Sequence, residues 1–401
     1  MNKHFLLRIW ILSWLSITSG CDSLTNFRDR KDTSDLGESV SDAGPKNSGV
    51  RDTPIALSVA HAGLCGQWLK SDFPQRFKTT VLENPRELSS SLCLHMLSAF
   101  GSQISVRTEV GMEERLLDIL LNQERAIEIL GHPTLYESAF GVRPYARPEA
   151  GRGSQAHHDQ LLCCLAQMGV SPNVRSKVGG QDRTVNDLLA DSLADFFISK
   201  KELAFTAIAY AHLLPPRRSW KNKFDEEVSF SDVVDELLSR DIGASHCFGT
   251  HLFEAMIVIY RVDREHGPIL NANCRKRLEK RIAELVSTAV GRQKLDGSWG
   301  SRWFSIEPLP DAEDDSQARP SMLLVTGHLI QMLAKLPDQF PVHEHVFQRG
   351  LRCLEMATSQ ASDEEMRRDF CPFSHAAWCL NHFGAFHEPS PNSRAVGSGK
   401  Q

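Results

Sequence analysis

Apolar residues recur every three or four positions through almost the whole chain after residue 50, which is the period of a helix that is buried on one side. No run of alternating β-branched residues competes with this pattern. The sequence therefore predicts an all-α body. Helices are predicted over residues 84–100, 113–130, 157–168, 184–199, 202–214, 230–240, 248–264, 272–292, 320–336, 343–359 and 373–384.

The ends of these segments carry residues that suit helix termini. Pro215 and Pro216 end a helical pattern, because proline cannot donate a helix hydrogen bond. Thr184, Ser231 and Asn273 stand near helix starts, and each has a side-chain oxygen that can accept a hydrogen bond from an exposed backbone amide. We therefore expect these three residues to cap their helices.

Two kinds of helix alternate along the chain. Residues 183–199 and 271–292 are amphipathic, as expected of helices on an outer surface, whereas 203–214 and 252–260 are apolar nearly all round. Such alternation predicts an α/α toroid, in which inner helices surround a central funnel. An α-solenoid of helical hairpins is the alternative.

One short motif links this pattern to a known family. Gln293, Gly297 and Trp299 form a Gln-x-x-x-Gly-x-Trp motif between an amphipathic and an apolar helix. In this motif the chain resembles the terpenoid cyclase and protein prenyltransferase superfamily, which includes squalene cyclases, over roughly residues 150–385. The resemblance implies an α/α toroid in which the motif ties helices together. It transfers no catalytic residue.

The N-terminus has the features of an export signal. Lys3 and Arg8 accompany a short apolar run at 9–17, which is too short to span a bilayer as a helix. The small residues that end in Gly20 and Cys21 resemble the lipobox of bacterial lipoproteins. This resemblance implies a signal peptide over 1–20, lipidation of Cys21, and a cell-envelope domain anchored to the membrane. Plain secretion and an uncleaved start are the alternatives.

The polar composition of residues 21–51 separates them from the predicted domain that follows. Residues 21–51 contain almost no apolar side chains, so we expect a disordered tether there. A toroid domain is predicted over 52–388 and a disordered tail over 389–401. The net charge of −5 and the lack of a Lys/Arg-rich block argue against a nucleic-acid partner. Export also argues against prenyl transfer, whose substrates are cytosolic.

Histidines recur at the starts of the apolar helices. His251 and His328 each follow a small pair of residues there, and His375 lies in a looser copy. His158 and Glu202 hold the corresponding places earlier in the chain. If these helices ring a funnel, the five side chains face its mouth and form a pocket for a ligand or an envelope partner. The alternative is that each one caps or braces a neighbouring helix end.

A metal is one use for such a pocket. Cys247 lies four residues before His251, so the thiolate and the imidazole can share a helical face and bind zinc. The alternative for Cys247 is that of a small buried apolar residue. The sequence leaves open whether zinc is bound.

An acidic segment precedes the helix of His328. Asp311, Asp314 and Asp315 are close enough in sequence to raise one another's pKa and supply a general acid. The segment resembles the Asp-x-Asp-Asp acid motif of squalene and hopene cyclases, but Ala312 stands where the first aspartate belongs. A solvated acidic loop is the alternative.

A second enzyme class also fits an exported helical barrel. Such barrels resemble polysaccharide lyases and some glycosidases, which use His, Tyr or paired carboxylates in a central cleft. His158, Asp159, Glu202 and His251 could serve in this chemistry. The sequence therefore supports two functions for one pocket: binding of a ligand or partner, and an envelope enzyme of the lyase, hydrolase or metal-dependent type.

Overall fold

The computed structural model describes residues 50–57, 71–146, 148–216, 219–306 and 319–384. The predicted leader, the lipidation site Cys21, most of the tether and the tail lie outside these residues, as do Asp311, Asp314 and Asp315 of the acidic segment. Among the described helices, none combines the length and apolarity that a membrane span requires.

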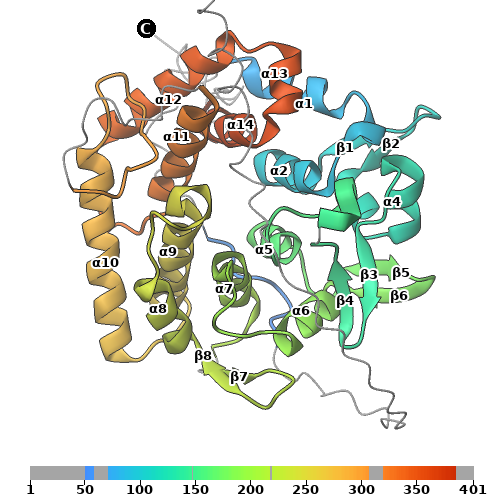
Figure 1. Cartoon of the computed structure of the whole chain (residues 1–401), viewed down its shortest axis with the longest axis horizontal. Helices are drawn as coiled ribbons and strands as arrows, with labels where there is room; N and C mark the ends of the chain where they lie inside the picture. The colour runs from blue at the N-terminus through green and yellow to red at the C-terminus, as the bar shows by residue number, and fades with distance from the viewer. Residues whose placement is uncertain (1–49, 58–70, 147, 217–218, 307–318, 385–401) are drawn as a thin grey trace, which may run out of the picture. The chain divides into compact units, whose positions relative to one another are not determined.

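The described residues are mostly helical (Figure 1). The α-helices are α1 (Phe73–Leu82), α2 (Ser90–Phe100), α3 (Leu116–Leu120), α4 (Gln123–Leu130), α5 (Gln160–Gln167), α6 (Val185–Ala194), α7 (Leu203–Leu213), α8 (Phe230–Ser239), α9 (Thr250–Glu265), α10 (Ala272–Gly291), α11 (Arg319–Ala334), α12 (Glu344–Ser359), α13 (Asp363–Arg368) and α14 (Phe370–Gly384). Short 3-10 segments are η1 (Pro85–Glu87), η2 (Pro148–Gly153) and η3 (His246–Gly249).

The predicted helical segments are confirmed, with three main local differences. The helix predicted over 184–199 ends five residues early, at Ala194. The segment predicted over 84–100 begins as the 3-10 turn η1 and becomes α-helical only at Ser90. The segment predicted over 113–130 begins as a strand and is then interrupted between α3 and α4, where Asn122 has extended backbone angles and caps α4. The helices α1 and α13 were not predicted.

One predicted helix cap is confirmed and two are wrong. Thr184 caps α6 in a reciprocal capping box. The cap of α8 is Ser229, not Ser231, and the cap of α10 is Asn271, not Asn273. In both cases the true cap lies two residues earlier and accepts a backbone amide one turn ahead, at 3.2 Å for Ser229 and 2.8 Å for Asn271.

The structure also contains small antiparallel hairpins that the pattern did not predict. Their strands pair as β1 (Ser105–Arg107) with β2 (Glu113–Arg115), β3 (Leu135–Ser138) with β4 (Gly141–Pro144), β5 (Arg175–Val178) with β6 (Gln181–Thr184), and β7 (Ser219–Lys221) with β8 (Glu227–Ser229). Each hairpin buries one valine: Val106, Val142, Val178 or Val228. A strand of three or four residues with one buried side chain shows no alternation long enough to recognise.

Six helices, which we call the inner helices, pack on one another in sequence: α2, α5, α7, α9, α11 and α14 (Figure 1). The last of them, α14, packs back on α2. Neighbouring inner helices run in the same direction, since Arg261 near the end of α9 donates to the backbone oxygen of Lys335, just after α11, at 3.2 Å. Likewise, Asn381 of α14 contacts the Ala99 carbonyl near the end of α2 at 3.4 Å.

The remaining long helices lie behind the inner ones. The amphipathic α10 packs on α9, α12 packs on α11 and α14, and α8 packs on α7 and α9. In contrast, α7 is buried along its whole length except at Phe205. The two kinds of helix read from the sequence therefore occupy different positions, with the apolar ones between their neighbours.

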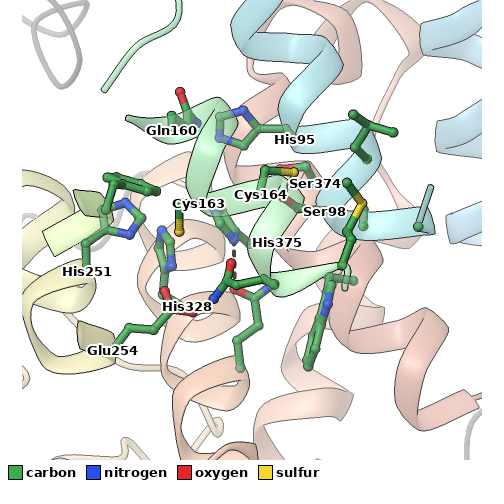
Figure 2. A pocket seen from close by; sticks show the side chains of 18 of the residues that line it. His95, Ser98, Gln160, Cys163, Cys164, His251, Glu254, His328, Ser374 and His375 are labelled. Atoms are coloured by element: carbon green, nitrogen blue, oxygen red, sulfur yellow. Dashed lines mark hydrogen bonds between the residues drawn. The ribbon is translucent and has the colours of Figure 1, made fainter. Parts of the chain in front are cut away.

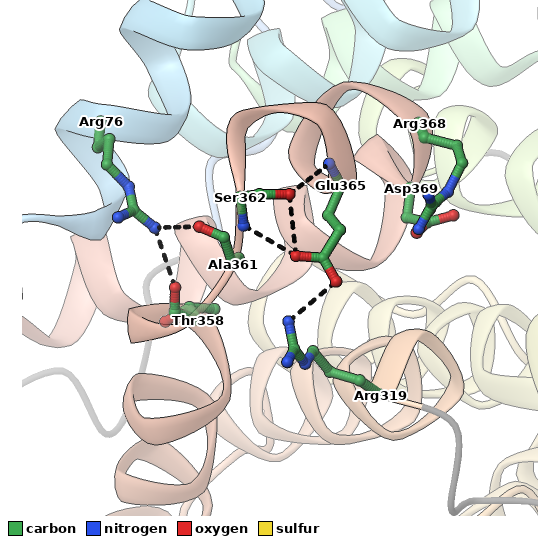
Figure 3. A network of polar contacts seen from close by, with 8 residues as sticks. All are labelled: Arg76, Arg319, Thr358, Ala361, Ser362, Glu365, Arg368 and Asp369. Carbon is green, nitrogen blue, oxygen red and sulfur yellow. Dashed lines mark hydrogen bonds and ion pairs between the residues drawn. The ribbon is translucent and has the colours of Figure 1, made fainter.

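A polar network joins the first described helix to the last part of the chain (Figure 3). Arg76 of α1 donates to the Thr358 carbonyl at 3.1 Å and to the Ala361 carbonyl at 3.0 Å. These oxygens lie at the C-terminal end of α12, where helix carbonyls have no partner within the helix. Glu365 completes a capping box at the start of α13 and pairs with Arg319 of α11 at 3.2 Å. The network fixes α1, α11, α12 and α13 relative to one another.

The Gln-x-x-x-Gly-x-Trp motif lies at the end of α10 and contacts two other helices. The side-chain amide of Gln293 donates to the Gly297 carbonyl at 3.0 Å and to the Val346 carbonyl of α12 at 2.8 Å. The buried Trp299 donates its indole N–H to the Ala289 carbonyl at 2.7 Å, which satisfies an oxygen in the last turn of α10. The motif thus joins α10 to α12 and contributes no side chain to the site described next.

The segment 50–57 lies against the C-terminal end of α7. Arg51 donates its backbone N–H to the Leu213 carbonyl at 3.0 Å, and Ile55 donates to the His212 carbonyl at 3.1 Å. The His212 ring returns a hydrogen bond to the Ile55 carbonyl at 2.5 Å. The predicted domain start at residue 52 falls within this segment.

Candidate functional site

The inner helices surround a cavity of about 490 Å³. Every one of them contributes polar side chains to its wall. Figure 2 labels such residues from α2, α5, α9, α11 and α14. The histidines of the wall are His95 from α2, His157 before α5, His212 from α7, His251 from α9, His328 from α11, and His375 and His382 from α14.

The five predicted pocket residues have different positions. His251, His328 and His375 line the cavity; His251 and His328 are buried, and His375 is partly buried. Glu202 lies beside the cavity wall, and its carboxylate accepts the backbone N–H of His158 at 3.2 Å, just before the start of α5, as the bracing alternative expects. His158 lies outside the cavity lining: its half-exposed ring contacts the Asp159 carboxylate at 3.1 Å, next to the start of α5. Its position fits the bracing role.

The neighbouring residue His157 occupies the place that His158 was predicted to take. His157 is buried and its ring stacks on Phe205 with a centroid separation of 4.8 Å. Its Nδ1 lies 3.0 Å from a carboxylate oxygen of Glu202. Since a carboxylate can only accept, Nδ1 carries a proton, so Nε2 is the nitrogen that offers a lone pair in the neutral form of the ring.

Five of the imidazole rings follow one another across the cavity. The ring centroids are 5.2 Å apart between His157 and His251, 4.7 Å between His251 and His328, and 3.6 Å between His328 and His375. His95 follows at 5.7 Å from His375. Figure 2 shows His251, His328 and His375 following one another, with His95 beyond them. The inner helices thus gather residues that lie far apart in the sequence.

Burial favours the neutral form of four of these imidazoles, those of His95, His251, His328 and His375. It lowers the pKa of His251 to about 3, with a smaller contribution from His157, and lowers the pKa of His95 to about 4. The pKa values of His328 and His375 also lie well below the usual range, first because of burial and then because of the neighbouring histidines. Neutral imidazole is the form that binds metals and both donates and accepts hydrogen bonds.

Three ring nitrogens of the cavity histidines lack a hydrogen bond. Among the described residues, Nδ1 of His251 and Nε2 of His212 and His328 have no partner although all are buried. A buried polar atom without a partner costs about 1–3 kcal/mol. Each of these atoms is therefore available to an external partner.

Two clusters in the cavity wall combine histidines with a cysteine. In the first, His157, Cys247 and His251 place one ligand atom each within 4.8 Å of one another. In the second, His95, Cys371 and His375 do the same. We call these the buried cluster and the half-buried cluster, because all three residues of the first are buried whereas Cys371 and His375 are not fully so.

The sequence contained a signal for the half-buried cluster that we missed. Cys371 stands four residues before His375, just as Cys247 stands four residues before His251. The repeated Cys-x-x-x-His spacing marks both clusters. His95 and His157 carry no comparable signal, since His95 lies within a helix of apolar residues and His157 is one of two adjacent histidines.

The cavity wall contains one carboxylate among the described residues, Glu254 of α9. Burial favours its neutral form, but its ion pair with Lys335 outweighs burial, and the pKa of Glu254 lies below the usual range. Gln167 also donates to this carboxylate at 2.8 Å. Glu254 is therefore ionised and held by its partners, which does not suit a general acid.

The chain matches no protein-family model, no curated protein and no solved structure. The chemistry of the site therefore depends on its geometry.

Proposed function

We propose that this protein is an exported, lipid-anchored protein of the cell envelope, similar to prenyltransferase and squalene cyclase toroids, whose central cavity binds a small polar ligand. One observation carries the proposal: the inner helices enclose a cavity lined by histidines, three of which are buried and have a ring nitrogen without a partner among the described residues. Its membrane attachment is proposed through Cys21.

The toroid is supported by the order of helix contacts. Each inner helix packs on the next, neighbours run in the same direction, and α14 packs back on α2. A solenoid of hairpins has open ends and would not bring its last inner helix against its first. The joining of α10 to α12 by Gln293 is the role that the motif has in the toroid family.

The chemistry of the wall favours a small polar ligand. Imidazole nitrogens and the side-chain amides of Gln160, Gln167 and Gln331 offer both donors and acceptors. The volume of about 490 Å³ falls within the range of about 300–1,000 Å³ that small-molecule sites occupy.

The lyase or hydrolase alternative has less support. Hydrolysis by paired carboxylates needs two acidic groups that face the substrate, and the described cavity wall offers only Glu254, which is tied to Lys335. Asp159 is buried against Thr206 and His158, outside the cavity lining. A metal-dependent enzyme fits the wall better, because its histidines and cysteines are metal ligands.

A blocked cavity tests the proposal. Ser98 lines the cavity but is exposed, so Ser98→Trp should fit at the cavity edge and fill part of the space. Gln103→Trp is the matched control, because Gln103 is exposed nearby and does not line the cavity. The measurement is the melting temperature of each protein with a panel of small sugars, amino acids and carboxylates.

We expect some compounds to raise the melting temperature of the wild type and of Gln103→Trp equally, but not that of Ser98→Trp. A compound that stabilises Ser98→Trp as strongly as the wild type binds outside the cavity. If no compound in the panel stabilises the wild type, the proposal of a small polar ligand is wrong.

A further inference from the structure

We infer that the buried cluster of His157, Cys247 and His251 is a zinc site with three protein ligands and a fourth position that is open to the cavity. This inference rests on the proposed function, because the metal would form part of the surface that meets the ligand. Four features support it: the spacing of the ligand atoms, the carboxylate behind His157, the conformation of Cys247, and the unpartnered nitrogen of His251.

The spacing of the ligand atoms suits a metal after a small contraction. The three atoms lie within 4.8 Å of one another. In a tetrahedral zinc site with bonds of about 2.0–2.3 Å, neighbouring ligand atoms lie about 3.3–3.8 Å apart. Each side chain therefore needs a movement of about 1 Å or less, which small rotations of its side-chain torsions supply.

A carboxylate orients the first ligand. Glu202 accepts the Nδ1 proton of His157 at 3.0 Å, which leaves Nε2 of His157 as the metal-binding nitrogen. Metal-binding histidines commonly donate their second N–H to a carboxylate in this way. The position of Glu202 is itself fixed by the backbone N–H of His158 at 3.2 Å and by Nε2 of His246 at 3.1 Å. Glu202, chosen from the sequence as a pocket residue, is on this evidence a positioning residue.

The second ligand lies in a strained turn. Cys247, Phe248 and Gly249 have φ angles of +49°, +55° and +74°, so three successive residues are left-handed. Only glycine adopts this conformation without cost, and such strain tends to persist at functional sites. Two hydrogen bonds hold the turn, from the Thr250 hydroxyl to the Cys247 carbonyl at 2.7 Å and from the Trp303 indole to the Phe248 carbonyl at 2.8 Å. The turn holds Cys247 beside His251.

The third ligand, His251, has a ring nitrogen without a hydrogen bond among the described residues. His251 is 9% exposed, lies in the first turn of α9, and has no hydrogen-bond partner for Nδ1 among the described residues. A bound metal ion would give this ring the partner that the described residues do not provide. If the histidine were purely structural, nothing would offset the free-energy cost of burying a ring nitrogen without a hydrogen bond.

The ligand set selects zinc. Two imidazoles and one thiolate suit zinc, and sites that act on ligands keep three protein ligands with water or substrate in the fourth position. The cluster faces the cavity, since all three residues line it. Copper also takes two histidines and a cysteine, so the experiment has to separate the two metals.

The test is a metal titration of the full chain after treatment with a chelator. Cobalt(II) serves as the probe, because a cysteine thiolate bound to cobalt gives a charge-transfer absorption in the near ultraviolet and a four-coordinate site gives strong visible bands. We expect one equivalent of cobalt to bind, one equivalent of zinc to displace it, and Cys247→Ser to lose the charge-transfer band. His251→Ala should weaken binding at least about 100-fold.

The half-buried cluster provides the matched control. Cys371→Ser changes the same residue type at the same spacing, and it should keep the full cobalt spectrum. The melting temperature of each metal-free variant shows whether it is folded, and Cys247→Ser, which differs from the wild type by one atom, should keep its fold.

Three outcomes would overturn the inference: no stoichiometric binding of cobalt or zinc by the wild type, a charge-transfer band that survives in Cys247→Ser, or a band that Cys371→Ser loses. Stoichiometric copper without zinc in the protein as purified would also overturn the zinc assignment, whereas displacement cannot separate the two metals because copper binds such ligand sets more tightly than zinc. The titration uses no organic ligand, so it can fail while the Ser98→Trp experiment succeeds, and the reverse.

Discussion

The two cysteine–histidine clusters use the same residue types at the same spacing but differ in what lies behind the histidines. In the buried cluster, His157 donates to the carboxylate of Glu202 at 3.0 Å. In the half-buried cluster, His375 donates to the amide oxygen of Gln331 at 3.0 Å and His95 to the Ser91 carbonyl at 2.7 Å. All three partners fix the tautomer of the ring, but only the carboxylate adds a negative charge that favours a bound cation.

The cysteines differ as well. Cys247 is buried in a turn whose backbone is left-handed, whereas Cys371 lies in the first turn of α14 and is only partly buried. Helical spacing alone brings Cys371 near His375, so that arrangement needs no strain. The same ligand types at the same spacing therefore do not make equivalent metal sites. The buried cluster has a carboxylate behind one histidine and a strained turn at its cysteine, and the half-buried cluster has neither.

The largest expected effect is one that the two clusters share. Burial lowers the pKa of His251 to about 3 and that of His95 to about 4, while an unfolded chain titrates its histidines near about 6.5. Below about pH 6.5 these histidines bind protons in the unfolded state but not in the folded state. The free energy of unfolding of the metal-free protein should therefore fall by about 1.4 kcal/mol per pH unit for each such histidine, down to about pH 4.

Urea unfolding at a series of pH values measures this loss. His251→Gln and His95→Gln should each lower the number of protons that the protein takes up on unfolding by about one. Unequal effects of His251→Gln and His95→Gln would show that the clusters differ in burial as well as in their supports. A flat profile between pH 7 and pH 5 would contradict the neutral, buried state of both clusters.

The next effect separates the backbones of the clusters. A Cβ at Gly249 would lie 2.5 Å from the Ile242 carbonyl oxygen at a φ of +74°, so Gly249→Ala should destabilise the protein by about 3 kcal/mol. Gly327 packs against the half-buried cluster, and its added Cβ would lie 2.7 Å from that of His375. Gly327→Ala keeps an ordinary helical backbone, so we expect a smaller loss of about 1–2 kcal/mol. Equal losses in urea unfolding would remove the argument that the turn at Cys247 is strained.

The smallest effect tests the supports of the histidines. Glu202→Gln should weaken cobalt and zinc binding by about 10–100-fold, because it removes the charge behind His157 and keeps the shape of the side chain. Gln331→Ala removes the corresponding support of His375, and it should change the affinity by less than about threefold. Competition with a chromophoric chelator gives both values. An equal change in the two variants would indicate that the metal lies between the clusters and not in one of them.

Most of the helical architecture could be predicted from the sequence, because the helices bury residues on a regular period over ten or more positions. The hairpins could not, since their strands are only three or four residues long and each hairpin buries a single valine, such as Val106 or Val142. The true caps Ser229 and Asn271 were missed for a related reason. Two residues after each true cap stands another residue, Ser231 or Asn273, that can cap equally well. Which of the two caps the helix depends on where the preceding segment ends, and the sequence pattern does not fix that point to within two residues.

The sequence predicted the part of the candidate site that comes from a repeated pattern of small residues next to a histidine. His251, His328 and His375 all lie near small residues of inner helices and line the cavity. The predicted position at a helix start holds only for His251, because α11 already begins at Arg319 and α14 at Phe370. The choice between His157 and His158 depends on the backbone: Asp159 has a φ of +57°, which turns the chain so that the first histidine faces inward. Nothing in the sequence marks a left-handed aspartate.

The segment 50–57 gives the cavity a wall that comes from outside the inner helices. It is hydrogen-bonded to the end of α7, and Leu57 lines the cavity itself. A shortened protein that begins after Leu57 would lose this wall and leave the carbonyls of His212 and Leu213 without their partners. The boundary for producing the isolated domain therefore lies at or before Val50, and ligand affinities measured on shorter versions would describe a different cavity.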